Sequence, residues 1–404
     1  MPALTMHKFT IDRYAGAAEA LRQRDLRQAL YDEGAVIMDR VLVNLHGDEH
    51  KARRNLESKV FRRDFFKFYE TTVFPATLAE TLAPLLAAGR MDLVDFGYRV
   101  MVNLTADFTG IDRPDRSPRE TEELVATLRI FGRAATLAHY KDDRDAVRRE
   151  TVATLARFDR DYFTPSVKRR ARLLEQFAAG AIDETALPRD VLTVLLRNED
   201  GIDLDRDVTL REIAFFALAG AHTSIHTLSH AMHELFTWCA LHPQDRARLE
   251  TDPLFVQRCV HESIRLHPSS PVAARRALCP VALPDERNAT QGDEVIIDLH
   301  TANRDMAAFG DDASDFNPYR VLQKGQTPYG LSFGLGMHAC LGLNLAAGVL
   351  PKPDTDPAQH HYGTVAMIVR ALLAHHVHPD PADAPAKDAT TARDLWGRYP
   401  VLLE

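Results

Sequence analysis

One cysteine is set apart by its neighbours. Cys340 lies in the string Phe333-Gly-Leu-Gly-Met-His-Ala-Cys-Leu-Gly342, which leads into Leu343-Asn-Leu-Ala-Ala. This pattern predicts a glycine-rich turn that delivers a thiol to the start of a helix, where the helix dipole and free backbone N–H groups stabilise a thiolate. The glycines remove side chains where a large flat ligand needs close approach to the backbone. Such a thiolate suits a single axial bond to a metal, and a structural cysteine in a turn is the plainer alternative.

The same string resembles the haem-binding signature of the cytochrome P-450 family, Phe-x-x-Gly-x-x-x-Cys-x-Gly, and matches it at every fixed position. The resemblance implies that Cys340 is the thiolate ligand of the iron in haem b (iron protoporphyrin IX). Electron donation from such a ligand favours O–O cleavage. The resemblance also implies that Phe333, Gly334 and Gly342 contact this cofactor.

Two charges, Glu262 and Arg265, lie three residues apart and therefore on one face of a predicted helix. An isolated surface pair of this kind contributes little to stability. Because Leu266-His-Pro follows and Cys340 lies 78 residues later, the context is similar to the family's Glu-x-x-Arg helix. The resemblance implies a structural role, in which the pair binds Arg320 and supports the haem pocket from the proximal side.

The string Ala219-Gly-Ala-His-Thr223 lies inside the longest apolar helical stretch. A glycine inside a helix costs about 1 kcal/mol relative to alanine, so we expect either a local opening for a ligand or a close contact between packed helices. The string is similar to the family's Ala/Gly-Gly-x-Asp/Glu-Thr oxygen-activation motif. The resemblance implies that Thr223 is the alcohol that helps to stabilise and protonate iron-bound dioxygen.

His222 occupies the place where the family's motif has an acid. Three interpretations stay open. A histidine can relay protons because its reference pKa of about 6.5 is near working pH. It can also contact an acidic group of the substrate, or it can be a hydrogen-bonded core histidine that faces away from the cofactor.

Cationic or hydrogen-bonding side chains must neutralise the two propionates of a haem. By the resemblance, the candidates are His50, Arg54, Arg275 and His338. The neighbouring Arg53 and Arg276 leave two of these assignments ambiguous by one residue.

The elements that position these residues are mostly helices. Apolar residues recur at helical spacing in five ranges: 49–68, 121–139, 144–163, 165–179 and 209–238. Thr209 and Glu212 have the spacing of a capping box at the start of the last range. Val295 to Leu299 predicts a strand, residues 303–342 a long irregular segment, 364–375 a helix and 399–403 a terminal strand.

The expected fold class is therefore mainly α with a small β region. The resemblance implies the cytochrome P-450 fold, a triangular helical prism around a buried haem, in a single domain over residues 1–404. The helix that contains His50 begins early, so the N-terminal region looks shortened. Residues 351–361 look like a loop inserted into the helix that follows Cys340.

Composition excludes several classes of protein. The net charge of −8 disfavours a generally basic nucleic-acid binder, and no stretch approaches the roughly eighteen apolar residues of a membrane span. The first residues lack a signal-peptide core. The four cysteines include no close pair, which disfavours a zinc cage or a disulfide scaffold. We expect a cytoplasmic protein.

The expected function is that of a soluble bacterial haem-thiolate monooxygenase, which inserts one oxygen atom from O₂ into a small organic substrate in secondary or catabolic metabolism. The alternatives are a peroxide-driven or otherwise atypical haem-thiolate enzyme, suggested by His222, and a non-catalytic haem-binding protein. The expected substrate pocket comprises Phe215, Phe216, Ala219, Val272 and Ala273. Core packing is as good an account of the two phenylalanines.

Electrons are expected to arrive from a ferredoxin that is served by a ferredoxin reductase. The segment 51–67 holds seven basic and two acidic residues, a local charge of +5. In the family this helix borders the surface where reductants dock, and complementary charge would steer an acidic ferredoxin to it. A solvated helix face is the simpler interpretation of the same charges.

Overall fold

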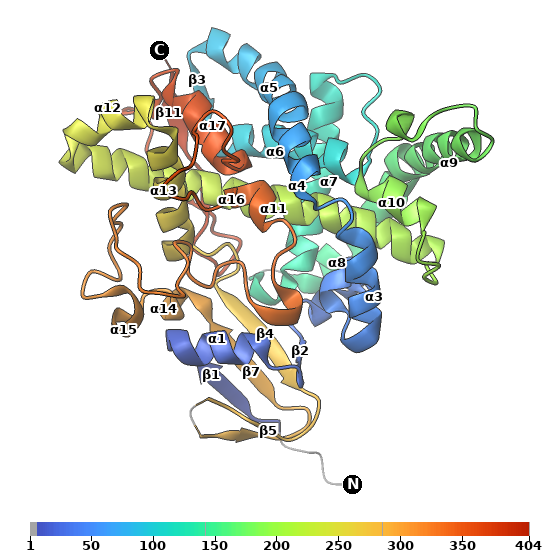
Figure 1. The fold of residues 1–404 in the computed structure, drawn as a ribbon, viewed down its shortest axis with the longest axis horizontal. Helices are drawn as coiled ribbons and strands as arrows, with labels where there is room; N and C mark the ends of the chain where they lie inside the picture. Colours follow the sequence, from blue (N-terminus) through green and yellow to red (C-terminus); the bar gives the residue numbers. More distant parts are fainter. Residues whose placement is uncertain (1–5, 142, 285, 404) are drawn as a thin grey trace. The chain divides into compact units, whose positions relative to one another are not determined.

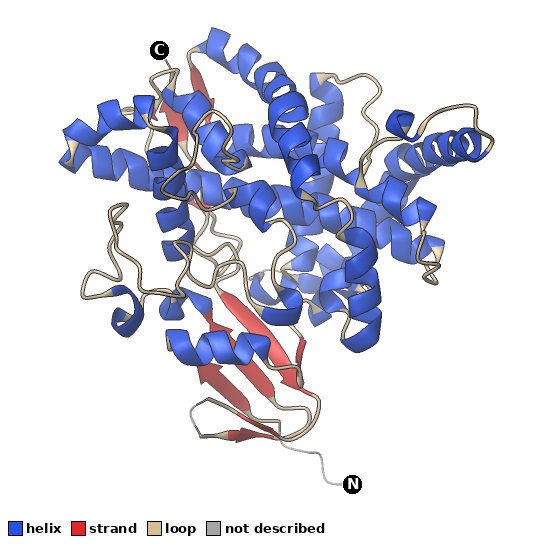
Figure 2. Ribbon diagram, in the orientation of Figure 1, coloured by secondary structure: helices blue, strands red, loops and turns tan. Residues whose placement is uncertain are grey.

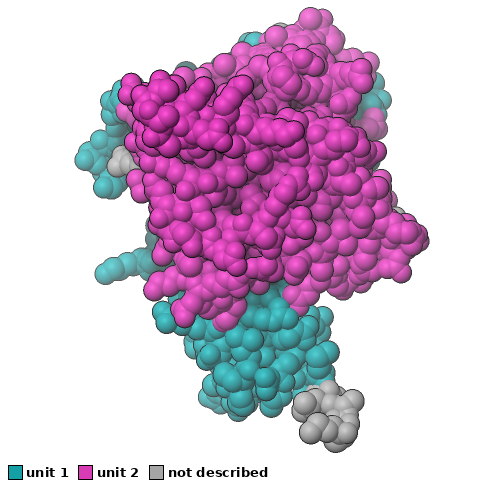
Figure 3. All heavy atoms as spheres, turned by 90° about the vertical axis from the view of Figure 1, so that its right-hand side faces the viewer, with its two compact units in different colours: residues 1–30, 226–386, 399–404 teal, residues 31–225, 387–398 magenta. Residues whose placement is uncertain are grey.

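Helices make up most of the computed structural model, and the strands form small sheets (Figures 1 and 2). The structure describes residues 6–141, 143–284 and 286–403. They form two compact units: residues up to 30, 226–386 and from 399 onward are unit 1, and 31–225 with 387–398 are unit 2 (Figure 3). The predicted fold class, mainly α with a small β region, is confirmed. The single-domain organisation over 1–404 stays a prediction.

Unit 2 is almost entirely helical. Its longer helices are α3 (Gly47–Glu57), α4 (Arg63–Phe68), α5 (Phe74–Ala88), α6 (Leu93–Thr109), α7 (Pro118–Ala135), α8 (Arg144–Phe158), α9 (Thr164–Ala178) and α10 (Val191–Arg197). Turns of π-helix over Tyr69–Val73 and Asp159–Phe163 join α4 to α5 and α8 to α9. Pro75 and Pro165 follow these turns directly. Because proline lacks an N–H group, the hydrogen-bond ladder shifts at these points.

The prediction of one continuous helix over residues 49–68 is wrong, because α3 ends at Glu57 and α4 begins at Arg63. The break allows Val60 to become buried. It also places the ring of Phe61 5.0 Å from that of Phe108 and 5.8 Å from that of Phe216, measured between centroids. The burial of Val60 and the ring contacts of Phe61 therefore replace about one turn of helix.

The longest helix, α11 (Arg206–Leu241), has 36 residues and runs from unit 2 into unit 1. The capping box predicted for Thr209 and Glu212 is wrong. The cap is Asp205, whose carboxylate accepts a hydrogen bond of 2.7 Å from the N–H of Val208. Thr209 lies inside the first turn, and Glu212 is fully buried and bonded elsewhere.

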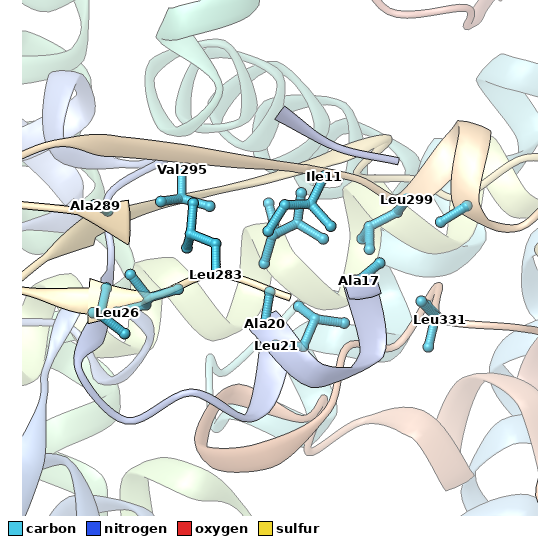
Figure 4. Packing of buried hydrophobic residues seen from close by; sticks show 14 of the residues in the cluster. Ile11, Ala17, Ala20, Leu21, Leu26, Leu283, Ala289, Val295, Leu299 and Leu331 are labelled. Atoms are coloured by element: carbon cyan, nitrogen blue, oxygen red, sulfur yellow. The ribbon is translucent and has the colours of Figure 1, made fainter. Parts of the chain in front are cut away.

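The main sheet of unit 1 has the strand order β1-β7-β4-β2, with β1 (Lys8–Ile11), β2 (Leu26–Gln28), β4 (Val272–Ala277) and β7 (Glu294–Asp298). β1 pairs with β7 in parallel, and the other pairs are antiparallel. Figure 4 shows the apolar side chains that pack helix α1 (Tyr14–Arg22) onto this sheet, among them Ala17, Leu21 and Val295. The strand predicted at 295–299 is confirmed as β7.

The remaining elements of unit 1 are short, apart from three helices. They are α12 (Pro243–Thr251), α13 (Pro253–Leu266), α14 (Leu299–Ala302), α15 (Met306–Phe309), α16 (Leu343–Ala347), α17 (Thr364–Leu373), and the strands β5 (Val281–Ala282), β6 (Asn288–Ala289), β8 (His378–Pro379) and β11 (Pro400–Leu402). The predicted helix at 364–375 and the terminal strand are confirmed as α17 and β11. The described segment 303–342 is irregular apart from α15 and a short 3₁₀ turn.

The predicted inserted loop lies between α16 and α17. Gly348 and Gly363 stand at its ends, with φ of +72° and +83°. A Cβ atom on Gly363 would lie 2.3 Å from the backbone nitrogen of Gly348, so the chain returns to the point where it left. The side-chain amide of Gln257 donates to the carbonyls of Ala347 and Tyr362, each at 3.0 Å. Gln257 therefore holds the two ends of the loop.

One helical run, Asp64–Ala88, is long and apolar enough to cross a membrane by length and composition. Helices of soluble proteins pass the same test, so this finding is weak evidence for a membrane protein.

Candidate active site

The Cys340 turn of unit 1 has the form that the sequence predicts. The N–H of Cys340 donates to the carbonyl of Phe333 at 2.9 Å, which closes the turn, and α16 begins three residues later. Gly334 and Gly336 have φ of +64° and +69°, a region that favours glycine. A Cβ atom on Gly342 would lie 3.9 Å from the sulfur of Cys340, in van der Waals contact with the thiol.

The side chains around this thiol fit a large apolar cofactor. Cys340 is exposed, and the apolar residues Phe333, Leu335, Leu341 and Leu345 beside it are only half-buried. Apolar side chains collected around one accessible thiol are suited to a flat apolar ligand that bonds to sulfur. The donor set is a single thiol, which matches one axial bond.

Two of the other three cysteines are poorer candidates for a metal bond. Cys259 is buried, and burial raises the pKa of its thiol well above the usual value. Burial also raises the pKa of Cys239. Because the thiolate is the ligand form, both favour the protonated state that binds metal weakly. Cys279 is exposed.

Glu262, Arg265 and Arg320 form a buried group in unit 1 that we call the Glu262 cluster. Arg265 donates to both oxygens of Glu262, at 2.8 and 2.7 Å, and Nε of Arg320 donates to Glu262 at 3.0 Å. Arg265 also donates to the carbonyls of Asn303 and Ala313, and Arg320 to the carboxylate of Asp312. The cluster therefore fastens α13 to the irregular segment that leads towards Cys340.

Several residues in the middle of α11 are more exposed to solvent than their neighbours in the helix. Phe215, Ala219, Gly220 and His222 are half-buried, and Thr223 is exposed. The hydroxyl of Thr223 donates to the carbonyl of Ala219 at 2.7 Å. An accessible hydroxyl in the middle of a 36-residue helix is available to a ligand on that face.

The glycine in this helix has a packing reason. A Cβ atom on Gly220 would lie 2.6 Å from Cγ2 of Thr105 on α6. Of the two expectations for Gly220, the structure supports close contact between helices, because any larger residue would push α6 away.

His222 has two partners in unit 2 that the motif does not predict. Its Nδ1 lies 3.3 Å from the hydroxyl of Tyr98, and its Nε2 lies 3.5 Å from Nη1 of Arg393. Because a guanidinium only donates, Nε2 accepts and the proton lies on Nδ1, which donates to Tyr98. Burial, together with the charge of Arg393, lowers the pKa of His222 to about 3. The ring is therefore neutral at physiological pH.

On α3, the structure distinguishes Arg53 from Arg54. Arg53 is buried and binds the carboxylates of Glu57, at 3.1 Å, and of Glu212 on α11. We call Arg53, Glu57 and Glu212 the Arg53 cluster. Arg54 is half-buried one turn from His50. Because two carboxylates neutralise the charge of Arg53, Arg54 is the better candidate to bind an anionic group of a ligand.

His50 is buried, and burial together with the charge of Arg54 lowers its pKa to about 4. The imidazole is therefore neutral in the chain by itself. It can still donate one N–H hydrogen bond to an oxygen ligand.

The two neighbouring arginines of β4 point to opposite faces of the strand. Arg275 is buried and donates to the side chain of Gln28, its partner on β2. Arg276 donates to the carbonyl of Gly292 at 3.1 Å. His338 is half-buried at the end of the 3₁₀ turn that precedes Cys340.

The predicted pocket residues divide into two groups. Phe216 packs against Phe61 in the core of unit 2, and Ala273 belongs to the apolar cluster under the sheet of unit 1. These two side chains are core residues. Phe215, Ala219 and Val272 are half-buried and accessible to a ligand.

Comparison with known proteins relates the whole chain to one family. The family profile described as Cytochrome P-450 matches residues 160–348. The biotin biosynthesis cytochrome P-450 of Bacillus subtilis (strain 168) is 22% identical over 324 residues, which are 78% of this chain and 71% of that protein. The crystal structure of P450BioI, in complex with an acyl carrier protein that carries hexadec-9Z-enoic acid, shares the fold with a TM-score of 0.75 and 18% identity over 98% of this chain and 92% of that chain.

The chain has the cytochrome P-450 fold, and the profile match and the related proteins support its membership of that family. It is a haem-thiolate monooxygenase, and the cofactor of the family is haem b. Related chains use redox partners: the bifunctional cytochrome P-450/NADPH–P-450 reductase 2 of Bacillus subtilis (strain 168) is 28% identical over 180 residues, 39% of this chain and 17% of that protein.

Proposed function

We propose that this chain inserts one oxygen atom from O₂ into a small organic substrate, with Cys340 as the iron ligand. The observation that carries the proposal is the accessible thiol of Cys340 in its glycine turn. When bound, the haem supplies the activation of O₂. Phe333, Gly334 and Gly342 would contact the haem, and His50, Arg54, Arg275 and His338 would neutralise its propionates. The organism type, a bacterium, and a cytoplasmic location belong to the same proposal.

Thr223 is the residue that we assign to proton handling. The residue is exposed, and its hydroxyl donates to the carbonyl of Ala219. A hydroxyl that donates one hydrogen bond can also accept one. A threonine hydroxyl held in this way can accept a hydrogen bond from water and orient it. Phe215, Ala219 and Val272 would contact the substrate.

His222 acts as a positioning residue rather than as an ionising relay. It is neutral, and its ring nitrogens contact Tyr98 and Arg393. These contacts hold α11 in place one residue before Thr223. Of the three interpretations of His222, its contacts favour the hydrogen-bonded core histidine.

A ferredoxin, with its ferredoxin reductase, is the proposed electron donor. The charge that segment 51–67 presents is smaller than its sequence indicates. Arg53 is buried against two carboxylates, and Lys59 pairs with Glu199 at 3.3 Å and Asp200 at 3.0 Å. Lys51, Arg62 and Lys67 are exposed. The side chain of Arg63 lies outside the described part of the chain. These exposed cations remain suited to an acidic partner.

The test compares variants of four cysteines. The reduced carbon-monoxide complex of the purified holoenzyme should absorb at the wavelength that names the family. Cys340→Ser should abolish the band, whereas serine at Cys239, Cys259 or Cys279 should leave it. A band that survives in Cys340→Ser would contradict the proposal.

A second test concerns His222 and Thr223. Thr223→Ala should lower the ratio of product to electrons consumed. In the wild type this ratio should not follow an ionisation near pH 6.5, because His222 is neutral across that range. An ionisation of this kind that disappears in His222→Ala would restore the relay interpretation.

A further inference from the structure

Unit 2 contains a cavity of about 500 Å³ whose lining includes none of the residues assigned to the cofactor or the substrate. Its walls come from the end of α3, the turn to α4, and the chain from residue 184 through α10. Sites for small molecules usually measure about 300–1,000 Å³. The cavity is therefore large enough for a ligand of about ten to twenty non-hydrogen atoms, by the same comparison.

The lining carboxylates are all neutralised by cations of the protein. The pairs are Asp64 with Arg189 at 2.6 Å, Glu184 with Arg197 at 2.5 Å, Asp190 with Arg170 at 2.7 Å and Glu199 with Lys59 at 3.3 Å. These pairs also occupy the lining cations Arg189, Arg197 and Lys59. A cationic ligand would therefore have to displace an existing ion pair.

Arg62 is different. It lines the cavity, its side chain is exposed, and it forms no ion pair or side-chain hydrogen bond with the residues that the structure describes. A guanidinium binds a carboxylate with two parallel hydrogen bonds. Among the described lining residues, the charge that is not already paired is therefore the positive charge of Arg62.

A second polar group in the wall lacks a partner. Thr193 is 5% exposed, and its hydroxyl has no hydrogen-bond partner within the described chain, although its backbone N–H bonds to Asp190. Leaving a buried polar group unsatisfied costs about 1–3 kcal/mol. Because its oxygen is almost inaccessible to solvent, Thr193, which lines the cavity, would turn its side chain to meet an oxygen of a ligand.

Four further lining residues are large and apolar. Leu56, Val60 and Phe65 come from the α3–α4 side, and Leu187 comes from the opposite side. All four are at most 7% exposed. A ligand that fills the cavity therefore contacts apolar side chains along its body and Arg62 at its head.

We propose that this cavity binds an amphipathic monoanion, a carboxylate with an apolar body, separately from substrate oxidation. The head contacts Arg62, an oxygen engages Thr193, and the body contacts the apolar wall. The site needs neither Cys340 nor the cofactor, so the proposal does not depend on the proposed function.

The experiment is calorimetric titration of the holoenzyme with acetate, hexanoate and decanoate, while the haem absorption is recorded in parallel. We expect decanoate to bind at one site without changing the haem spectrum, and at least tenfold more tightly than acetate. Decylamine and decanol should release no comparable heat. Arg62→Gln should weaken decanoate binding at least tenfold, and Thr193→Val at least threefold.

Lys51→Gln is the matched control, because it removes one exposed charge from the same helical region without touching the cavity. It should change the affinity less than twofold. Equal affinity for acetate and decanoate, equal loss in Lys51→Gln and Arg62→Gln, or heat that always accompanies a change in the haem spectrum would each overturn the proposal. Absence of heat with decanoate at millimolar concentration would overturn it as well.

Discussion

The Glu262 cluster and the Arg53 cluster are both buried ionic groups, but their charges are balanced differently. In the Glu262 cluster, two guanidiniums meet the carboxylates of Glu262 and Asp312, and backbone carbonyls take the remaining N–H groups. In the Arg53 cluster, one guanidinium meets two fully buried carboxylates. Oε2 of Glu57 has no hydrogen-bond partner among the described residues.

The difference shows what a buried charge needs in order to be stable. A buried ion must be paired and hydrogen-bonded, or it loses its charge. The first cluster meets this condition with protein groups alone. The second meets it only by holding a proton, and burial accordingly raises the pKa of Glu57 well above its usual value and that of Glu212 to about 7.

The largest effect is expected for Arg265→Met. The change leaves Glu262 with one cation and leaves the carbonyls of Asn303 and Ala313 without this donor. Breaking a buried pair in this way costs about 3–5 kcal/mol, so the midpoint of urea unfolding, followed by circular dichroism, should fall sharply. Arg258→Met is the control, because this exposed residue of the same helix donates only to the backbone carbonyl of Arg320, at 3.3 Å, among the bonds that the structure gives it. It should lower stability by less than about 1 kcal/mol. Equal midpoints for the two variants would show that the cluster is not a main support of α13.

Arg53→Met should cost less, about 2–3 kcal/mol, since the two carboxylates can take up protons when the cation is lost. The loss should grow as pH rises, because protonation then becomes harder. Lys51→Met serves as the control on the same helix. A loss that is the same at pH 6 and pH 8 would mean that the carboxylates do not exchange protons with solvent.

The wild type should become less stable as pH rises from about 4.5 through 7. Folded-state pKa values of Glu57 and Glu212 lie above the unfolded value, so the folded state binds more protons in this window and loses that advantage as pH increases. One proton held by the pair corresponds to about 1.4 kcal/mol per pH unit. Unfolding free energies measured between pH 5 and 8 would check the slope.

The smallest effect is expected for Glu57→Gln. The amide resembles the protonated acid, so stability at pH 6 should change by less than about 1 kcal/mol. The slope with pH should become flatter, because one of the two titrating carboxyls is gone. If the slope of the variant equals that of the wild type, the proton is not held at Glu57.

The sequence predicted those parts of the fold and site that depend on the spacing of residues close together in the chain. The turn around Cys340 follows from glycines that are close in the chain, and the Glu262–Arg265 contact follows from one turn of helix. The strand β7 and the helix α17 follow from alternation and periodicity. Each of these patterns needs no knowledge of what packs against it.

The features that the sequence could not predict depend on packing between distant segments. Tyr98 and Arg393 lie 124 and 171 positions from His222, and no motif connects them. The choice between Arg53 and Arg54 depends on which side of α3 faces Glu212. Gly220 and the break before Arg63 likewise depend on contacts with α6 and with Phe108.

The paired glycines at the base of the loop between α16 and α17 have a consequence for how this chain tolerates change in length. Because Gly348 and Gly363 touch and Gln257 bonds to both flanking backbones, the separation of the loop ends is fixed independently of the residues between them. Doubling a flexible loop adds only about 0.6 kcal/mol of closure entropy. A folded domain whose termini lie close together can therefore be inserted at the exposed tip around Pro353 without disturbing the turn that contains Cys340.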